Sequence, residues 1–279
     1  MTSAQNPLDA ILAAVRDAPR RRIVLSEGED PRVAAAALRA KRDGLAEPIL
    51  LGDAAAVANQ LAAAGAQDGE VDIVDPKTDT RNAAYADAFH QLRKHKGVDA
   101  AAAAAAIASP LAFAAMMVRL GDAEGTVGGA VATTADTVRA ALQIIGRASG
   151  VKTVSSFFLM GVDAARHGRD GTVVFADCGL VVAPNPDELS EIAISSADSY
   201  RALTGETPQI AMLSFSTKGS AGGERVAAVA EATAKIRAAR PDLAVDGELQ
   251  FDAALVASVA EKKARRTCRR GRRRWRRPP

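Results

Sequence analysis

Short apolar runs rich in Val and Ile alternate along this chain with longer segments of helical periodicity. Three such runs lie early in the chain: RIVLS at 22–26, PILLG at 48–52 and VDIVD at 71–75. Strands that are separated by helices favour parallel pairing through crossover connections, so this order predicts an α/β fold. The 279 residues, 48% of them hydrophobic, are enough for one large core or two smaller ones.

Several helices can be predicted from their first residues. Asn6-Pro7 and Asp30-Pro31 each combine a capping side chain with proline at the first helical position. Residues 80–120 are expected to be helical, with a break at Pro110. A later helix is expected to begin with Asp136 as its N-cap and to reach about Arg147.

The second half of the chain continues the alternation. We expect strands at 151–159, 171–177, 209–215 and 243–247, and helices from Pro186, from about Gly223 and from about Gln250. The sequence Ala-Ser-Gly interrupts the pattern near Gly150, where we place a domain boundary. The expected organisation is an α/β domain at 1–150, a second at 151–263 and a disordered arginine-rich tail at 264–279.

The charge is unevenly distributed. The tail, ARRTCRRGRRRWRRPP, holds nine of the 36 basic residues and none of the 33 acidic ones, so residues 1–263 carry a net charge of −6. A protein that binds nucleic acid usually spreads its Lys and Arg over a folded face. We therefore do not expect a nucleic-acid partner for the body of the chain.

Other classes of protein are disfavoured by what the chain contains. Only Cys178 and Cys268 are present, which is typical of a reducing compartment and too few for a disulfide framework. His90 and His95 lie five residues apart, so they would point away from each other on a helix, and we expect no metal site. No apolar run approaches the roughly 18 to 20 residues that span a membrane, so a cytoplasmic protein is expected.

The first candidate binding segment is QLRKHKG at 91–97, where a helix is expected to end before Gly97. Arg93 offers a planar fork of donors that can bind a phosphate through two parallel hydrogen bonds. Cations at this position also stabilise the helix dipole, and that explanation is equally acceptable from the sequence alone.

The second candidate is GGAVATTADTVRAALQ at 128–143. Its glycines permit close backbone approach, Thr133 and Thr134 supply hydroxyl groups, and the next helix begins with free N–H groups that attract anions. Arg139 is expected in the first turn of that helix, where a cation opposes the dipole unless an anionic ligand is bound. An ordinary loop between strand and helix remains the alternative, because neither common phosphate-binding glycine spacing is present.

The third candidate is SFSTKGSAGG at 214–223, directly after an expected strand and before a helix. Ligands of open α/β sheets gather beyond the carboxyl ends of the strands. Ser216, Thr217, Lys218 and Ser220 could therefore surround a phosphate or pyrophosphate. A plain flexible loop is the alternative.

Taken together, five segments closely resemble the phosphate acetyltransferase (phosphotransacetylase) family: KTDTRNAAYADAFHQLRKHKGV, ASPLAFAAMMVRLGDAEGTVGGAVATTADTVRAALQI, DGTVVFADCGLV, IAMLSFSTKGSA and VDGELQFDAALV. The likeness runs in order from about Arg22 to about Glu261. It implies a reaction of acetate metabolism, in which acetyl-CoA and phosphate give CoA and acetyl phosphate, with coenzyme A as a substrate and no cofactor or metal.

The resemblance also implies a fold and site residues. The fold would be two Rossmann-like three-layer domains around a cleft, as in isocitrate and isopropylmalate dehydrogenases, usually in a homodimer. Arg93 and Arg139 would serve substrate binding and catalysis and converge on one acyl phosphate between the domains. Independently of the resemblance, the position and composition of their loops lead us to expect that CoA and phosphate groups bind at Thr133, Thr134, Ser216, Thr217, Lys218 and Ser220. Phosphate butyryltransferase is the alternative within the family.

The arginine-rich tail has no counterpart in the family, whose members continue past the position of Glu261 with an arginine for the phosphate and an aspartate proposed as the base. We expect that a change of reading frame near Lys263 produced the tail and that this chain is inactive or nearly so. A segment appended during cloning and a functional arm for nucleic acid on a non-catalytic fragment are the alternatives.

Overall fold

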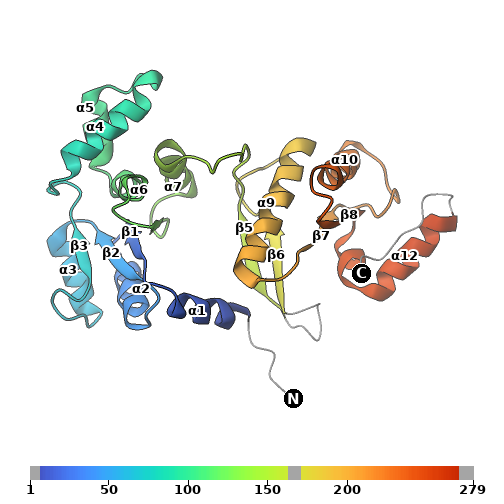
Figure 1. Cartoon of the computed structure of the whole chain (residues 1–279), viewed down its shortest axis with the longest axis horizontal. Coiled ribbons are helices and arrows are strands. Elements are labelled where there is room, and N and C mark those ends of the chain that lie inside the picture. The colour runs from blue at the N-terminus through green and yellow to red at the C-terminus, as the bar shows by residue number, and fades with distance from the viewer. Residues whose placement is uncertain (1–6, 163–170, 270–279) are drawn as a thin grey trace, which may run out of the picture. The chain divides into compact units, whose positions relative to one another are not determined.

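The computed structural model describes residues 7–162 and 171–269, and the chain divides into two compact units (Figure 1). One unit is Leu12–Ala148, and the other joins Met1–Ile11 to Ser149–Pro279. Helix α1 (Pro7–Asp17) spans the division at the predicted position, while its expected cap, Asn6, lies outside the described residues. Among the described residues, the first unit has one sheet and the second has two, and each unit has its own buried core.

The unit Leu12–Ala148 contains a four-stranded parallel sheet with the strand order β3-β2-β1-β4. Its strands are β1 (Arg22–Leu25), β2 (Glu47–Leu51), β3 (Asp72–Val74) and β4 (Gly125–Val127). The first three coincide with the expected runs, which confirms the parallel α/β character predicted from the alternation of strands and helices.

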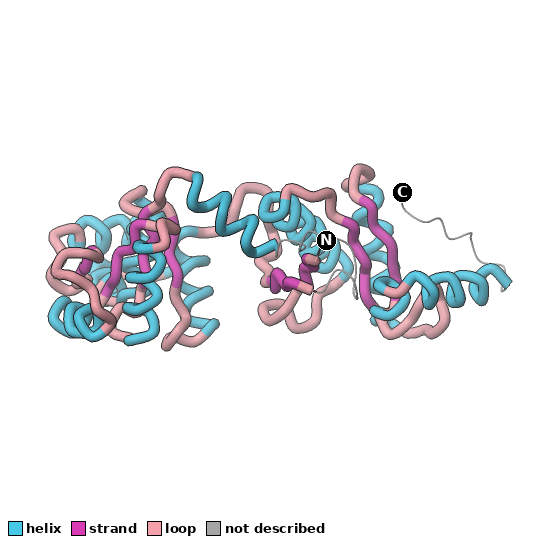
Figure 2. The backbone as a smooth tube through the Cα atoms, turned by 90° about the horizontal axis from the view of Figure 1, so that it is seen from below, coloured by secondary structure: helices cyan, strands magenta, loops and turns pink. Residues whose placement is uncertain are grey.

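Helices cover both faces of this sheet (Figure 2). They are α2 (Pro31–Arg42), α3 (Ala54–Ala63), α4 (Asn82–Arg93), α5 (Ala100–Ile107) and α6 (Pro110–Leu120). Ile49 and Leu51 of β2 belong to the core shared with α4, α5 and α6, whereas Leu50 belongs to the core shared with α2 and α3. The side chains of a strand alternate between the two faces of the sheet. Because both faces of β2 are buried, its sequence contains the continuous apolar run PILL.

The helical region 80–120 is broken at Pro110 and also before Gly97, which are the two places where the sequence predicts a helix to start or end. Besides the expected break at Pro110, helix α4 ends at Arg93 and is followed by the short helix η1 (Lys94–Lys96). Gly97 then takes a φ of 81°, a left-handed conformation that favours glycine. Helix α5 restarts only after Asp99, whose side chain accepts a hydrogen bond from the backbone N–H of Ala102 at 2.7 Å.

The unit that contains Ser149–Pro279 has two separate pairs of strands. Strands β5 (Phe157–Gly161) and β6 (Thr172–Ala176) pair antiparallel, and β7 (Gln209–Leu213) and β8 (Ala244–Leu249) pair parallel. The expectation of parallel strands throughout is therefore wrong for β5 and β6. A parallel pair needs a connection of about a dozen residues or more, and fewer separate Gly161 from Thr172.

Two helices pack against these strands and form the core of this unit. Helix α9 (Pro186–Thr204) begins with a reciprocal cap between Asn185 and Glu188, and α10 (Glu224–Ala239) connects β7 to β8. Gly247 of β8 permits close approach of these elements, because a Cβ on it would lie 2.5 Å from the Met212 Cβ and 2.6 Å from the Thr233 Oγ1. The buried residues of this core are Ala193, Ala197, Met212, Ala232, Ile236 and Leu243.

The last described elements are α11 (Phe251–Leu255) and α12 (Ala257–Arg269). Helix α12 includes the start of the arginine-rich segment, where the composition predicts a disordered tail. Ala, Lys and Arg all have high helix propensity, which favours this continuation. Residues 270–279 lie outside the described residues.

No single helix among the described residues combines the length and apolar composition of a membrane span. Helices α5 and α6 pass that test only as a pair, with a bend of 98° between them.

Candidate functional site

In the sheet of the unit Leu12–Ala148, the order in which strands are added reverses between β1 and β4, and the carboxyl ends of these two strands lie at that point. After β1 the chain crosses to β2 on one side, whereas β4 pairs with β1 on the other side. Open α/β sheets bind ligands beyond the carboxyl ends of the strands at such a point. Ser26 and Glu27 follow β1 here, and Gly128 follows β4.

Glu27 accepts hydrogen bonds from four consecutive backbone N–H groups of the loop that follows β4. Its Oε2 accepts from Gly129 at 2.9 Å and Ala130 at 2.7 Å, and its Oε1 accepts from Val131 at 2.9 Å and Ala132 at 2.6 Å. Consecutive N–H groups of this kind form an anion-binding concavity, which the sequence predicts for a substrate. In the structure a carboxylate of the chain itself occupies it.

The charge of Glu27 is stabilised by this arrangement. Partial burial by itself raises the pKa of a carboxyl group, but the N–H groups of Ala132, Val131, Ala130 and Gly129 act in the opposite direction. The pKa of Glu27 consequently lies below its ordinary value, and the side chain is ionised at neutral pH.

Helix α7 (Thr134–Ala140) follows directly, and its N-cap is Thr133 rather than the expected Asp136. The Thr133 hydroxyl accepts from the Asp136 N–H at 3.1 Å and donates to the Asp136 carboxylate at 2.7 Å. Arg139 therefore lies in the last turn, not in the first, and its guanidinium donates to Asp136 at 2.6 Å. Because Arg139 lies beyond the first turn, it does not oppose the positive end of the helix dipole, and the helix no longer requires a ligand to explain it.

The other residues predicted in this unit lie close along the chain or in a neighbouring helix. Thr134 is the first residue of α7 and is exposed. Arg93 is the last residue of α4, and α4 contacts η2 (Ala141–Ile145), which continues α7. The Arg93 Nε is buried and has no hydrogen-bond partner among the described residues. A buried guanidinium N–H without a partner is costly, so it is a candidate donor to a bound anion.

The loop between β7 and α10 brings the third set of predicted residues together. Ser216 and Thr217 are buried, and their side chains bond to residues at the end of β8. The Ser216 hydroxyl donates to the Glu248 carboxylate at 3.0 Å, and the same carboxylate accepts from the Gly219 N–H at 2.5 Å. The Thr217 hydroxyl accepts from the Gln250 N–H at 2.9 Å.

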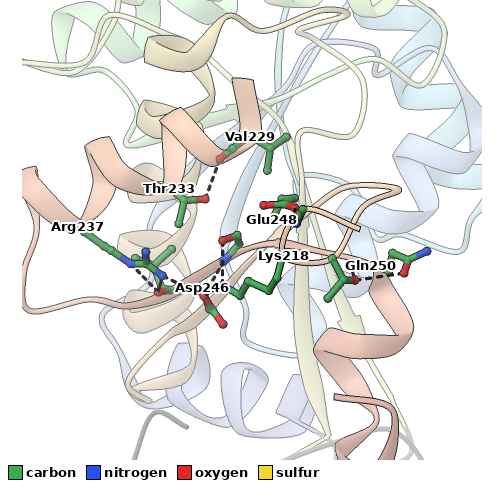
Figure 3. A network of polar contacts seen from close by, with 11 residues as sticks. Lys218, Val229, Thr233, Arg237, Asp246, Glu248 and Gln250 are labelled. Carbon is green, nitrogen blue, oxygen red and sulfur yellow. Dashed lines mark hydrogen bonds and ion pairs between the residues drawn. The ribbon is translucent and has the colours of Figure 1, made fainter. Parts of the chain in front are cut away.

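Lys218 is paired within this loop. Its ammonium group contacts the Asp246 carboxylate and donates to the Gly247 carbonyl at 3.0 Å, while Arg237 of α10 donates to the same carboxylate at 2.9 Å (Figure 3). Lys218 also has a φ of 50°, an uncommon conformation for a residue other than glycine. The loop is therefore held in one conformation by its bonds to β8. Lys218 is already paired with Asp246, so a ligand of Lys218 would bind next to that carboxylate.

Ser220 completes the turn, since its hydroxyl accepts from the Thr217 N–H at 2.9 Å. Ser216, Thr217, Lys218 and Ser220 therefore lie together in the unit that contains Ser149–Pro279, and Arg93, Thr133, Thr134 and Arg139 all lie in the unit Leu12–Ala148. Among the described residues, no group of His, Cys, Asp and Glu could hold a metal ion.

Sequence reasoning missed the two carboxylates that organise these loops, Glu27 and Glu248. Glu27 follows a predicted strand and could have been noticed for that reason. No local pattern indicates its partners, which are more than 100 residues away along the chain. The second carboxylate, Glu248, lies in strand β8 and accepts from the Ser216 hydroxyl, which is 32 residues away along the chain.

Comparison with known proteins gives a consistent result. The family model for phosphate acetyl/butaryl transferase matches residues 8–272. A phosphate acetyltransferase from Paracoccus denitrificans is 49% identical over 92% of this chain and 77% of its own length. A phosphate acetyltransferase from Thermoanaerobacterium thermosaccharolyticum is 45% identical over 88% of this chain and 74% of its own length.

Solved structures agree with these sequence relatives. The crystal structure of a phosphotransacetylase from Streptococcus pyogenes superposes with a TM-score of 0.84 and 40% identity. The superposition covers 92% of this chain and 77% of that protein.

Proposed function

Because this chain belongs to the phosphate acetyl/butaryl transferase family, we propose that it transfers an acetyl group reversibly between coenzyme A and inorganic phosphate. The observation that carries the proposal is the 49% identity to a phosphate acetyltransferase over 92% of the chain. The chain is an acyltransferase, and its substrates are acetyl-CoA and phosphate in one direction and acetyl phosphate and CoA in the other.

We propose that Arg93 and Arg139 bind the phosphate part of acetyl phosphate. Two observations support these roles: the Arg93 Nε has no hydrogen-bond partner within the part of the chain that the structure describes, and Arg139 is exposed beside Asp136. In the reaction the CoA thiol, with an ordinary pKa of about 8.5, gives its proton to a general base, and the sulfur forms a bond to the acetyl carbon. The bond from that carbon to the phosphate oxygen breaks, and phosphate leaves with the electron pair. Guanidinium groups stabilise the charge on the departing phosphate.

The hydroxyls of Thr133 and Thr134 lie at the start of the helix that carries Arg139, and we propose that they contact the same phosphate. For Ser216, Thr217, Lys218 and Ser220 we propose a role in CoA binding. Since Ser216 and Thr217 are buried and bonded to β8, their part in this role is to hold the loop, and Lys218 supplies the cation that CoA phosphates would meet.

At the level of architecture, we propose two Rossmann-like domains around a cleft, assembled as a homodimer in the cytoplasm. The parallel sheet with helices on both faces supports this proposal for the unit Leu12–Ala148.

The test is an assay of thioester formation from acetyl phosphate and CoA by the purified 279-residue chain. A full-length phosphate acetyltransferase assayed beside it supplies the reference rate. The expectation from the sequence that this chain is inactive or nearly so stays a prediction, and the same comparison tests it. Stabilisation of the fold by CoA and by phosphate, measured as a rise in Tm, tests substrate binding separately from turnover.

The family model also includes butyryl transfer, so butyryl phosphate is the second substrate to compare. Butyryl phosphate has two more methylene groups than acetyl phosphate, and each methylene group in an apolar pocket changes the binding free energy by only about 1–3 kcal/mol. We expect a higher kcat/KM for acetyl phosphate, and a preference for butyryl phosphate would assign the chain to the other activity of its family.

A further inference from the structure

Glu27 fixes the loop that leads from β4 into α7. Each of its two carboxylate oxygens accepts two N–H groups, so the four residues Gly129–Ala132 are all held by one side chain. Hydrogen bonds to a charged acceptor are about twice as strong as neutral ones. A loop that would otherwise be free to move is therefore attached to the end of β1.

The opposite side of the same loop is held as well. The Arg32 guanidinium donates to the Ala130 carbonyl at 2.9 Å and is itself paired with Asp30. Gly129 takes a φ of 101°, which a residue with a side chain rarely adopts. Loop residues are thus fixed through their N–H groups, through a carbonyl group and through backbone conformation.

A short series of contacts connects this loop to Arg139. Ala132 precedes Thr133, the N-cap of α7, whose hydroxyl is bonded to Asp136 in both directions. Asp136 in turn accepts from the Arg139 guanidinium at 2.6 Å. The position of Arg139 relative to β1 therefore depends on the conformation of the four residues that Glu27 holds.

We infer that Glu27 is a positioning residue for the reaction, which acts on substrate through Arg139. This inference rests on the proposed function, because it takes Arg139 as a ligand of the substrate phosphate. Glu27 itself is not expected to touch substrate, since both of its oxygens are already bonded to backbone N–H groups. A misplacement of a substrate-binding group by about 1 Å can lower a rate by about 10²-fold.

The test compares Glu27→Gln with a matched control, Glu29→Gln. Glutamine keeps the shape of Glu27 but presents a donor in place of one oxygen, so two of the four N–H groups lose their acceptor. Glu29 lies two residues away and accepts a single N–H, from Asp53, on the side of α3. We expect E27Q to lower kcat/KM for acetyl phosphate by about 10- to 100-fold with little change in the KM for CoA, and E29Q to have no such effect.

A double-mutant cycle with Arg139→Ala separates positioning from general damage to the fold. If Glu27 acts through Arg139, E27Q has almost no further effect on kcat/KM in the R139A protein. A full additive loss in that background would overturn the inference.

Hydrogen exchange provides a readout that needs no turnover. In E27Q, the amides of Gly129–Ala132 and of α7 should exchange faster, while those of β1 and β2 keep their protection. Unchanged exchange in the loop and in α7 would also overturn the inference. If the wild-type chain shows neither thioester formation nor a rise in Tm with CoA or phosphate, that result would instead count against the proposed function. Exchange in the loop and in α7 would then decide the role of Glu27 without any measurement of turnover.

Discussion

The Ser26 hydroxyl lies against Gly128, so closely that a Cβ on Gly128 would be 2.6 Å from the Ser26 Oγ. The Ser26 side chain is buried, and its hydroxyl has no hydrogen-bond partner among the described residues. The two residues directly follow the neighbouring strands β1 and β4. This contact therefore sets how closely the two strand ends approach beside the candidate phosphate site.

Gly128→Ala should destabilise the fold by about 1–3 kcal/mol, because the added methyl group overlaps the Ser26 Oγ. Ser26→Ala should partly restore stability in the double variant, since the Ser26 Cβ is 3.9 Å from the added atom, an ordinary contact distance. Leu111 limits the recovery, because its Cδ2 would lie at 3.1 Å. Urea denaturation of Gly128→Ala, Ser26→Ala and the double variant gives the free energy of unfolding of each, and from these the coupling energy between the two positions. Equal losses from Gly128→Ala with and without Ser26→Ala would show that the hydroxyl is not the obstacle.

Arg93→Ala and Arg139→Ala should each lower kcat/KM for acetyl phosphate by about 10²- to 10³-fold, because each removes a donor to the phosphate. The Tm shift caused by CoA should remain. Arg39→Ala is the matched control, since Arg39 is an exposed arginine of α2 that pairs with Asp43. Steady-state kinetics on the three variants measure the effect, and rates close to that of the Arg39 control would remove Arg93 and Arg139 from the site.

Glu248→Ala should cost about 1–3 kcal/mol in the free energy of unfolding, because it leaves the Gly219 N–H without its acceptor. It also leaves the Ser216 hydroxyl with longer bonds, such as that at 3.2 Å to the Ala221 carbonyl. Both groups bond to the same oxygen, Oε1, which Glu248→Gln can retain. Glu248→Gln should therefore lose much less stability. Denaturant titration compares the two variants, and a similar loss in both would indicate that the negative charge, rather than the acceptor, holds the loop.

Glu70 should make stability depend on acid pH. The hydrogen bond from Arg42, followed by that from the Gln67 N–H, lowers the pKa of Glu70 from 4.5 to about 2. A carboxyl group with a lowered pKa stabilises the fold above its unfolded pKa, and this contribution is lost as the pH falls from about 4.5 to about 2.

Between those pH values, the stability of the Glu70→Gln variant should fall less steeply with acid than that of the wild type. Acid unfolding followed by circular dichroism measures both slopes. When Arg42→Met is introduced into both proteins, the difference between their slopes should shrink. An undiminished difference would contradict the assigned cause of the lowered pKa.

The sequence alone was sufficient for the elements whose cause is local. Runs such as PILL, caps such as Asp30 and breaks such as Pro110 act within a few residues, so the strands β1, β2 and β3 and the start of α2 could be predicted. Family membership was also recognisable, because long motifs keep their order along the chain. The position of Arg139 in its helix was wrong by one turn, since Thr133 and Asp136 are both acceptable caps and only the path of the preceding loop selects Thr133.

Only the tertiary structure decided which side chains bind the N–H groups and the lysine of the candidate phosphate-binding loops. Glu27 and Glu248 satisfy N–H groups that composition suggested were free for a ligand, and Asp246 pairs with Lys218. The physical reason is that a hydrogen bond needs its partners within about 3 Å. Donor and acceptor reach this distance only when segments that are far apart in the sequence fold against each other. The residue types next to a donor along the chain therefore do not predict its acceptor.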